Sequence, residues 1–271
     1  MPNFKNTNNF NFIPVFENKK FFNHDLKLPN IFRMAVVGKS GSGKTVLTTK
    51  MLLHPSFLDY NRLYIYSKMI EAQPEIKKIC YAFNKNLNKE TIIEMFNKGI
   101  TQESFNDYVD KINQQLNLSQ QVEAECTSSI DDMNDENGFD ETKKNLVIFD
   151  DFQKDNMIND LAESLYENAR KKNVNLIYIG QRFKTIPKLI RTNLNFVVSF
   201  VQSKPDADLF YTEILSRIMD RKDFLKLTRN IWSGKGNKNK EKYNYIAINL
   251  DTDKIYTDIF GESPTNSDNE D

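Results

Sequence analysis

The sequence predicts an α/β fold in which helices cover both faces of a mostly parallel β-sheet. Short apolar runs have the length and composition of buried strands, at residues 31–37, 63–67, 146–150, 176–181 and 196–200. Segments with the helical spacing of apolar residues lie between them, at residues 45–53, 90–98, 102–118 and 161–169. Strands that alternate with helices are typical of βαβ units, whose parallel strands are buried on both faces.

The last third of the chain continues this pattern and then changes it. Helical spacing returns over residues 206–227. Two further apolar segments, residues 243–250 and 255–260, flank the turn Asp251-Thr252-Asp253. This arrangement predicts a C-terminal β-hairpin.

Composition marks the domain boundaries. Residues 1–29 are rich in Asn, Phe and Lys without a regular period, so we expect a partly mobile N-terminal arm. The main domain then covers residues 30–260, and residues 261–271 form an acidic tail. Between residues 119 and 142 the periodicity is lost and acidic side chains accumulate, which predicts a solvated, mobile insertion.

Charge and hydropathy exclude several classes of protein. Lys plus Arg and Asp plus Glu both number 37, so the chain lacks the overall positive charge of many nucleic-acid binders. The apolar content of 39% can bury a core, which excludes a wholly disordered chain. Since no run of 18 apolar residues occurs, we expect no membrane span.

Cysteine and histidine are scarce. Cys80 and Cys126 lie far apart in the chain, and the two histidines are His24 and His54. We therefore expect neither a structural disulfide nor a zinc site, which fits a reducing compartment.

Residues 38–45, with the sequence GKSGSGKT, match the pattern G-x-x-x-x-G-K-S/T of phosphate-binding loops. They follow a predicted strand and open a predicted helix, which is the context that the pattern requires. Glycines let successive backbone N–H groups face one anion, and the helix start adds partial positive charge. Lys44 is expected to reach the β- and γ-phosphates of ATP, and the Thr45 hydroxyl to bind Mg²⁺. The expected nucleotide contacts are Gly38, Ser40, Gly41, Ser42, Gly43, Lys44 and Thr45.

Polar side chains also end two later predicted strands, at residues 146–150 and 176–181. Asp150 and Asp151 follow the apolar run 146–149, and Gln181 ends the run 176–180. Parallel strands place their carboxyl ends at one edge of a sheet, so we expect these side chains to meet there. We assign Asp150 to the Mg²⁺ shell, Asp151 to the attacking water, and Gln181 to the γ-phosphate or the water.

The long interval between the phosphate loop and the paired acids also bears on the type of ATPase. Between Thr45 and Asp150 lies another strand candidate, residues 63–67. We interpret it as an extra strand between the two motifs, an arrangement suited to ATP-driven motors.

Three segments together resemble the FtsK–HerA superfamily and, more closely, the genome-packaging ATPases of poxviruses, other nucleocytoplasmic large DNA viruses and virophages. They are GKSGSGKT, NLVIFDDF and NARKKNVNLIYIGQRFKTIPKLIRTNLNFVVSF. The resemblance implies a P-loop ATPase of the additional-strand type. It also implies a homo-oligomeric ring that drives double-stranded DNA into a preformed capsid, with capsid vertex proteins as partners. The expected location is the virion or the viral factory in the host-cell cytoplasm.

The resemblance also implies roles for single residues. Asp150 matches the Walker B acid, and Gln181 matches the γ-phosphate sensor. Arg170 falls where the superfamily can offer an arginine to the neighbouring subunit's nucleotide, with Arg191 as the alternative. Many relatives in the wider class use Glu as the catalytic base, whereas this chain has Asp151.

Basic residues are concentrated towards the C-terminus. Residues 232–240, WSGKGNKNK, predict a flexible loop whose Lys235, Lys238 and Lys240 are candidate contacts to DNA phosphates. Two other functions stay open at this point, a P-loop kinase of a small molecule and a nucleotide-gated assembly scaffold with little turnover. The Asp150–Asp151 pair and Gln181 favour hydrolysis over the kinase.

Overall fold

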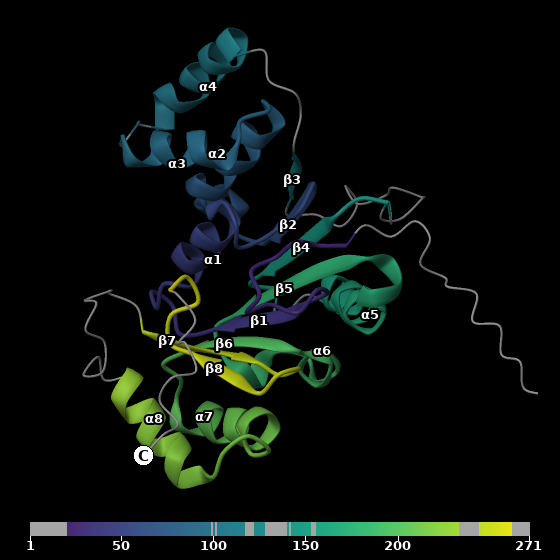
Figure 1. Ribbon diagram of the computed structural model, residues 1–271, viewed down its shortest axis with the longest axis vertical. Coiled ribbons are helices and arrows are strands. Elements are labelled where there is room, and N and C mark those ends of the chain that lie inside the picture. Colours follow the sequence, from purple (N-terminus) through teal and green to yellow (C-terminus); the bar gives the residue numbers. More distant parts are fainter. Residues whose placement is uncertain are drawn as a thin grey trace, which may run out of the picture.

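The computed structural model describes residues 21–98, 100, 102–116, 122–127, 140, 142–152, 156–232 and 244–261. In this part of the chain, eight strands form one sheet in the order β3-β2-β4-β5-β1-β6-β7-β8 (Figure 1). The strands are β1 Arg33–Val37, β2 Arg62–Ser67, β3 Glu123–Thr127, β4 Asn145–Asp150, β5 Val174–Gly180, β6 Phe196–Phe200, β7 Tyr245–Asn249 and β8 Lys254–Tyr256. The strands β1 to β6 are parallel to one another, β7 pairs antiparallel with β6, and β8 pairs antiparallel with β7. The predicted mostly parallel sheet and C-terminal hairpin are confirmed.

The strand that separates the two motif strands is not the one that sequence order indicated. The phosphate loop follows β1 and the paired acids end β4, and β5 lies between these two strands. The candidate at residues 63–67 became β2, which pairs with the outer side of β4. The additional strand is therefore β5, because the chain returns to the centre of the sheet after β4.

Helices cover both faces of the sheet, which explains why the four residues of β1 that follow Arg33 are all apolar. Met34 and Val36 pack into the core on one face, together with helices α1 to α4. Ala35 and Val37 pack into the core on the other face, together with α5 to α8. The helices are α1 Lys44–Leu53, α2 Pro74–Asn84, α3 Lys89–Asn97, α4 Gln102–Leu116, α5 Asn156–Lys172, α6 Lys188–Asn193, α7 Lys204–Phe210 and α8 Arg221–Trp232.

The helical segment predicted at residues 206–227 is interrupted. It forms α7, a π-helical turn over Tyr211–Leu215 and then α8. None of the helices in the described part of the chain is long and apolar enough to cross a bilayer.

Part of the predicted acidic insertion is regular structure. Residues 123–127 form β3, which pairs in parallel with β2 at the edge of the sheet. Glu123 and Glu125 point away from the core, whereas Ala124 is buried against it, so the strand has the alternation of a half-exposed edge strand. Residues 128–139 lie outside the described residues.

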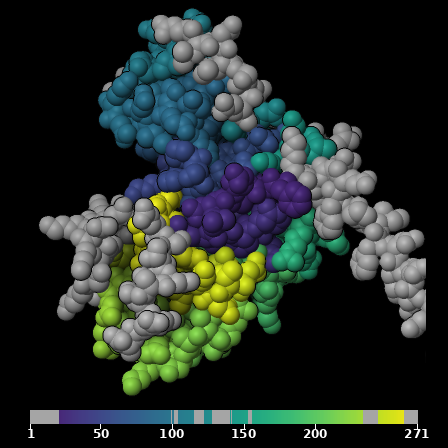
Figure 2. All heavy atoms as spheres, viewed as in Figure 1, coloured from purple at the N-terminus to yellow at the C-terminus, as the bar shows by residue number. Residues whose placement is uncertain are grey.

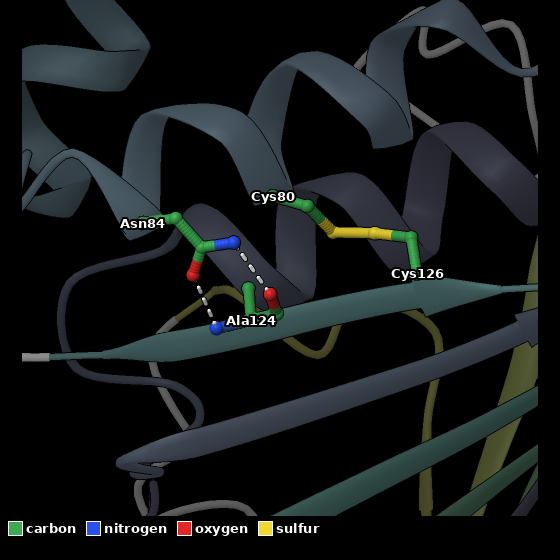
Figure 3. The surroundings of a disulfide bond; sticks show 4 residues. All are labelled: Cys80, Asn84, Ala124 and Cys126. Atoms are coloured by element: carbon green, nitrogen blue, oxygen red, sulfur yellow. Dashed lines mark hydrogen bonds between the residues drawn. A yellow bond between two sulfur atoms is a disulfide. The ribbon is translucent and has the colours of Figure 1, made fainter. Parts of the chain in front are cut away.

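A disulfide joins Cys80 of α2 to Cys126 of β3, which corrects the expectation of no such bond (Figure 3). The two cysteines are 46 residues apart, but the pairing of β3 with β2 carries Cys126 beneath α2. One turn further along α2, the Asn84 side chain exchanges two hydrogen bonds of 2.7 and 2.8 Å with the backbone of Ala124. The edge strand is thus held to α2 by one covalent and two polar links.

Residues 21–29, the part of the predicted N-terminal arm that the structure describes, pack on the domain. Phe22 and Leu28 are buried, and the backbone N–H of Asn23 donates to Asp59 over 2.7 Å. The side chain of Asn249 in β7 donates to the carbonyl of Lys27. Figure 2 shows this segment, in dark purple, at the surface between α1 to α4, in blue, and the C-terminal hairpin, in yellow.

Candidate active site

A pocket of about 310 Å³ lies at the carboxyl edge of the parallel strands. It is formed where the phosphate loop follows β1, the acids end β4, and Gln181 follows β5. Its lining is Ser40, Gly41, Gly43, Lys44, Thr45, Val46, Met69, Gln73, Asp150, Asp151, Ile179, Gly180 and Gln181. The three motifs that sequence analysis singled out therefore meet in one cavity.

Glycines in the phosphate loop meet two different requirements. A Cβ on Gly38 would lie 2.5 Å from Ser42 Oγ and 2.7 Å from Phe200 Cβ, so only glycine fits. Gly41 and Gly43 adopt left-handed backbone conformations, with φ of 72° and 100°. The position of a Gly41 Cβ has open space around it, and Gly43 caps α1 without any side-chain hydrogen bond. The first N–H groups of α1 thus have no side-chain cap, which suits them to bind a phosphate.

Lys44 begins α1 and points back along the loop. Its Nζ donates to the carbonyl oxygens of Gly38 over 2.7 Å and Lys39 over 3.0 Å. Partial burial lowers the pKa of Lys44, and the charges of Asp150 and Asp151 oppose that shift. The ammonium group is therefore held in the pocket between the loop backbone and the acids.

Asp150 ends β4 and is half-buried at the edge of the pocket. Burial raises the pKa of its carboxyl group, as does the nearby charge of Asp151. Hydrogen bonds from Gln73 and Ser67 and the charge of Lys44 act in the opposite direction. The Gln73 amide Nε2 donates to Asp150 Oδ2 over 2.5 Å.

Asp151 leaves the sheet and faces Gln181. Its φ of 62° is left-handed, a conformation that Asp tolerates better than most residues. This turn lets both consecutive carboxylates line the pocket, although side chains alternate along a strand. Gln181 Nε2 lies 3.4 Å from both carboxylate oxygens of Asp151. The backbone N–H of Asp151 also donates to the Ile179 carbonyl, which ties the end of β4 to the end of β5.

The two candidate arginines lie outside this pocket. Arg170 is in the last turn of α5, just before β5 begins, at the amino edge of the sheet. The seven residues of β5 place it about 20 Å from the pocket of its own chain. Arg191 is committed within its own chain, because its guanidinium donates to Glu213 over 2.7 and 3.1 Å and to the carbonyls of Ile186 and Lys184.

Gln73 and Met69 line the pocket but were missed in the sequence analysis. Gln73 immediately precedes Pro74, which begins α2, so it is the N-cap residue of that helix. Gln is a poor N-cap residue compared with Ser, Thr, Asp or Asn. A glutamine directly before a helix-starting proline, just after a strand of the site, was the signal that could have identified it.

The predicted DNA-contacting lysines Lys235, Lys238 and Lys240 lie outside the described residues. The described basic residues of this region include two groups. Acidic partners bind Arg182, Arg191, Arg217 and Arg221. Among the described ion pairs none involves Lys222, Lys226 or Arg229, which lie at exposed positions of α8.

A family model covers most of the chain. The model described as "Poxvirus A32 protein" matches residues 18–256, which include every described strand and helix. The chain belongs to the poxvirus A32 protein family. With this family membership the chain is a viral DNA-packaging ATPase. A search of curated protein sequences found no significant match.

Several solved structures are similar to the chain. The DNA-packaging ATPase B204 of Sulfolobus turreted icosahedral virus is 12% identical, with a TM-score of 0.47, over 82% of this chain and 94% of that chain. The genome-packaging NTPase B204 of Sulfolobus turreted icosahedral virus 2, in complex with AMP, is 12% identical, with a TM-score of 0.45, over 84% and 97%. VirB4 of Thermoanaerobacter pseudethanolicus is 10% identical, with a TM-score of 0.42, over 85% and 89%.

Proposed function

We propose that the chain is a motor that hydrolyses ATP in this pocket and uses the energy to move double-stranded DNA into a preformed capsid. The single observation that supports this most is the convergence of the phosphate loop, Asp150, Asp151 and Gln181 on one cavity. A kinase would need a second-substrate pocket, whereas two carboxylates and an amide at the carboxyl edge suit the activation of water.

The residues of the pocket divide the chemistry among them. The loop N–H groups and Lys44 bind the phosphates, and Lys44 neutralises negative charge on the transferred group. Asp151 accepts a proton from the attacking water or orients it, and Gln181 contacts the γ-phosphate from the neighbouring strand.

The pocket also fits Mg²⁺. Thr45 offers a hydroxyl and Asp150 a carboxylate, and both line the same cavity; Mg²⁺ prefers oxygen ligands of this kind. When bound, the metal would supply positive charge that offsets the negative charge of the phosphates. ATP and Mg²⁺ are therefore the proposed cofactors.

Arg170 is proposed to act on a neighbouring chain in a ring. Its position at the amino edge of the sheet keeps it from the nucleotide of its own chain, so contact with a nucleotide requires a second copy. An Arg170→Ala variant should bind nucleotide but lose turnover, and mixing it with Lys44→Ala chains should restore part of the activity. Lys171→Ala is the matched control, since it removes a neighbouring positive charge from the same helix turn. Absence of rescue in mixed assemblies would argue against action between chains.

The exposed face of α8 is the proposed contact to the DNA backbone. Lys222, Lys226 and Arg229 lie at positions i, i+4 and i+7, so they share one face of the helix, while Phe224 and Thr228 are buried behind them. Contacts from these cations to phosphates carry no sequence information, which is what a translocating motor requires. The helix ends at Trp232, where the predicted basic loop with Lys235, Lys238 and Lys240 begins.

Each phosphate contact contributes about −0.9 to the slope of log affinity against log salt concentration. Replacing the three cations by Gln should therefore make this slope less steep by about 2.7. The binding of a fluorescent duplex, measured at several salt concentrations, gives this slope. Neutralising Arg221, which pairs with Asp208, is the control with a smaller expected change. An unchanged slope in the triple variant would place the DNA elsewhere.

The decisive experiment is steady-state ATP hydrolysis with and without long double-stranded DNA. Several-fold stimulation that is absent from Lys44→Ala would support the motor. Transfer of phosphate to a small acceptor would instead indicate a kinase, and nucleotide binding without turnover would indicate an assembly scaffold. The proposed setting is a ring at a capsid vertex, in the virion or in the viral factory of the host-cell cytoplasm.

A further inference from the structure

Gln73 reaches the active site from a part of the chain that no motif marks. It lies between the 3₁₀ turn Ile70–Ala72, which follows β2, and the start of α2. Its side chain lines the same pocket as Lys44 and Asp150. The 2.5 Å hydrogen bond from its Nε2 to Asp150 Oδ2 joins residues that are 77 positions apart.

The backbone of Gln73 is fixed on both sides. Its N–H donates to the carbonyl of Ile70 over 3.1 Å, and its own carbonyl accepts from Ile76 and Lys77 over 3.1 and 3.2 Å. Pro74, the first residue of α2, restricts the backbone further. The side chain does not cap the helix, although it occupies the N-cap position. The amide is therefore presented to Asp150 from a rigid support.

That support is itself tied to the sheet edge. Cys80, two turns along α2 from Gln73, forms the disulfide with Cys126, and Asn84 bonds to Ala124 one turn later (Figure 3). Movement of α2 relative to the strands is opposed by these links. A side chain at the start of α2 thus keeps a fixed position relative to the end of β4.

Asp150 needs such a partner. Its carboxylate is largely buried. Lys44 lies in the same pocket, and its positive charge also attracts this carboxylate. Ser67, which lies opposite Asp150 in the pairing of β2 with β4, is the other hydrogen-bond donor to this carboxylate. Without the Gln73 amide, Oδ2 loses this donor, and the carboxylate is oriented by Ser67 alone among these two donors.

We propose that Gln73 is a positioning residue for Mg²⁺ binding: its amide holds the Asp150 carboxylate in the orientation that the metal requires. The inference rests on the proposed role of Asp150 as a metal ligand. Partners behind a metal ligand typically contribute 10- to 100-fold to metal affinity. Gln73 therefore acts through Asp150 and makes no contribution to ATP binding in the absence of metal.

The test replaces Gln73 by Met, which keeps the length of the side chain and removes the amide. Binding of a fluorescent ATP analogue is measured in EDTA and then across a Mg²⁺ titration. Gln73→Met should bind the analogue normally in EDTA, but should need about 10- to 100-fold more Mg²⁺ for the metal-dependent gain in affinity.

Two companion variants separate positioning from damage to the fold. Gln73→Asn keeps the amide but shortens its reach by one methylene, so an intermediate Mg²⁺ requirement is expected. Glu75→Gln alters an exposed residue in the first turn of α2 and should behave as wild type. If Gln73→Met melts at a lower temperature, Gln73→Asn, with the smaller change, still reports on the metal.

The outcomes distinguish this inference from the proposed function. If wild type shows a Mg²⁺-dependent gain in affinity and Gln73→Met shows the same midpoint, the positioning role is wrong and the ATPase proposal stands. A loss of affinity in EDTA equal to that in Mg²⁺ would also overturn it, because Gln73 would then contact the nucleotide. If wild type itself shows no metal-dependent binding, the role of Asp150 as a metal ligand fails first.

Discussion

The two walls of the pocket are built in different ways. The phosphate loop is one continuous stretch, residues 38–45, and its shape depends on glycines and backbone hydrogen bonds. The opposite wall, here called the acid wall, brings together Gln73, the Asp150–Asp151 pair and Gln181, which come from three distant segments. The first wall is therefore visible in the sequence as a motif, whereas the second exists only when the sheet and α2 are assembled. Damage to the loop should remove binding, and damage to the acid wall should mainly remove chemistry and metal dependence.

The largest effect is expected from the loop. Lys44→Ala removes the cation that lies between the loop carbonyls and the acids, so ATP turnover should fall below detection. Steady-state hydrolysis and nucleotide binding measure it. Lys39→Ala is the control, because Lys39 contributes its backbone carbonyl but presents an exposed side chain. Full activity in Lys44→Ala would refute the assignment of the loop.

On the acid wall, Asp151→Asn should separate binding from chemistry. The amide keeps the size of the side chain but cannot accept a proton from water, so the turnover rate should fall about 10²- to 10⁴-fold with unchanged ATP binding. Single-turnover hydrolysis with bound ATP measures the loss. A variant that turns over at the wild-type rate would show that Asp151 is only a residue of the turn.

The support of the acid wall is tested through the disulfide. Cys126→Ser should lower the free energy of unfolding by roughly 2–4 kcal/mol, since the bond closes a loop of 46 residues. Urea unfolding with and without reductant measures it, and the reductant should shift wild type but leave Cys126→Ser where it is. Equal midpoints for oxidised wild type and the variant would mean that α2 and β3 are held by packing and the Asn84 bonds alone.

Two glycines of the loop give the smallest and most local comparison. Gly38→Ala places a methyl group against Ser42 and Phe200 and should cost about 1–3 kcal/mol of stability. Gly41→Ala meets open space and should cost only the left-handed conformation, about 1 kcal/mol. Thermal melting of the two variants checks the order. A larger loss for Gly41→Ala would show that backbone strain, not crowding, limits the loop.

Much of the fold could be predicted because its central strands are short, continuous apolar runs. The strands β1, β4, β5 and β6 are buried on both faces, so composition alone marks them. The edge strand β3 has only two buried residues of five and lies among acidic residues, so the sequence pattern predicts an irregular insertion there. Its pairing with β2 is a tertiary event, and the disulfide could not be predicted for the same reason.

The site divides in the same way. The loop residues, Asp150, Asp151 and Gln181 were predicted at the pocket because strand ends and motifs are local features. Gln73 was missed because its position depends on how the turn after β2 folds back over β4. The interaction of Arg191 with Glu213, 22 residues away, likewise became visible only in the folded chain.

The acidic residues of the edge strand β3 affect how copies of this chain can associate. Open sheet edges invite pairing with another copy, and like charges directly opposite each other destabilise such pairs. A second β3 laid beside the first would place Glu123 and Glu125 of both copies on one face. The other edge is β8, a strand of only three residues. Joining of copies of this chain into a continuous sheet through these two strands is therefore disfavoured.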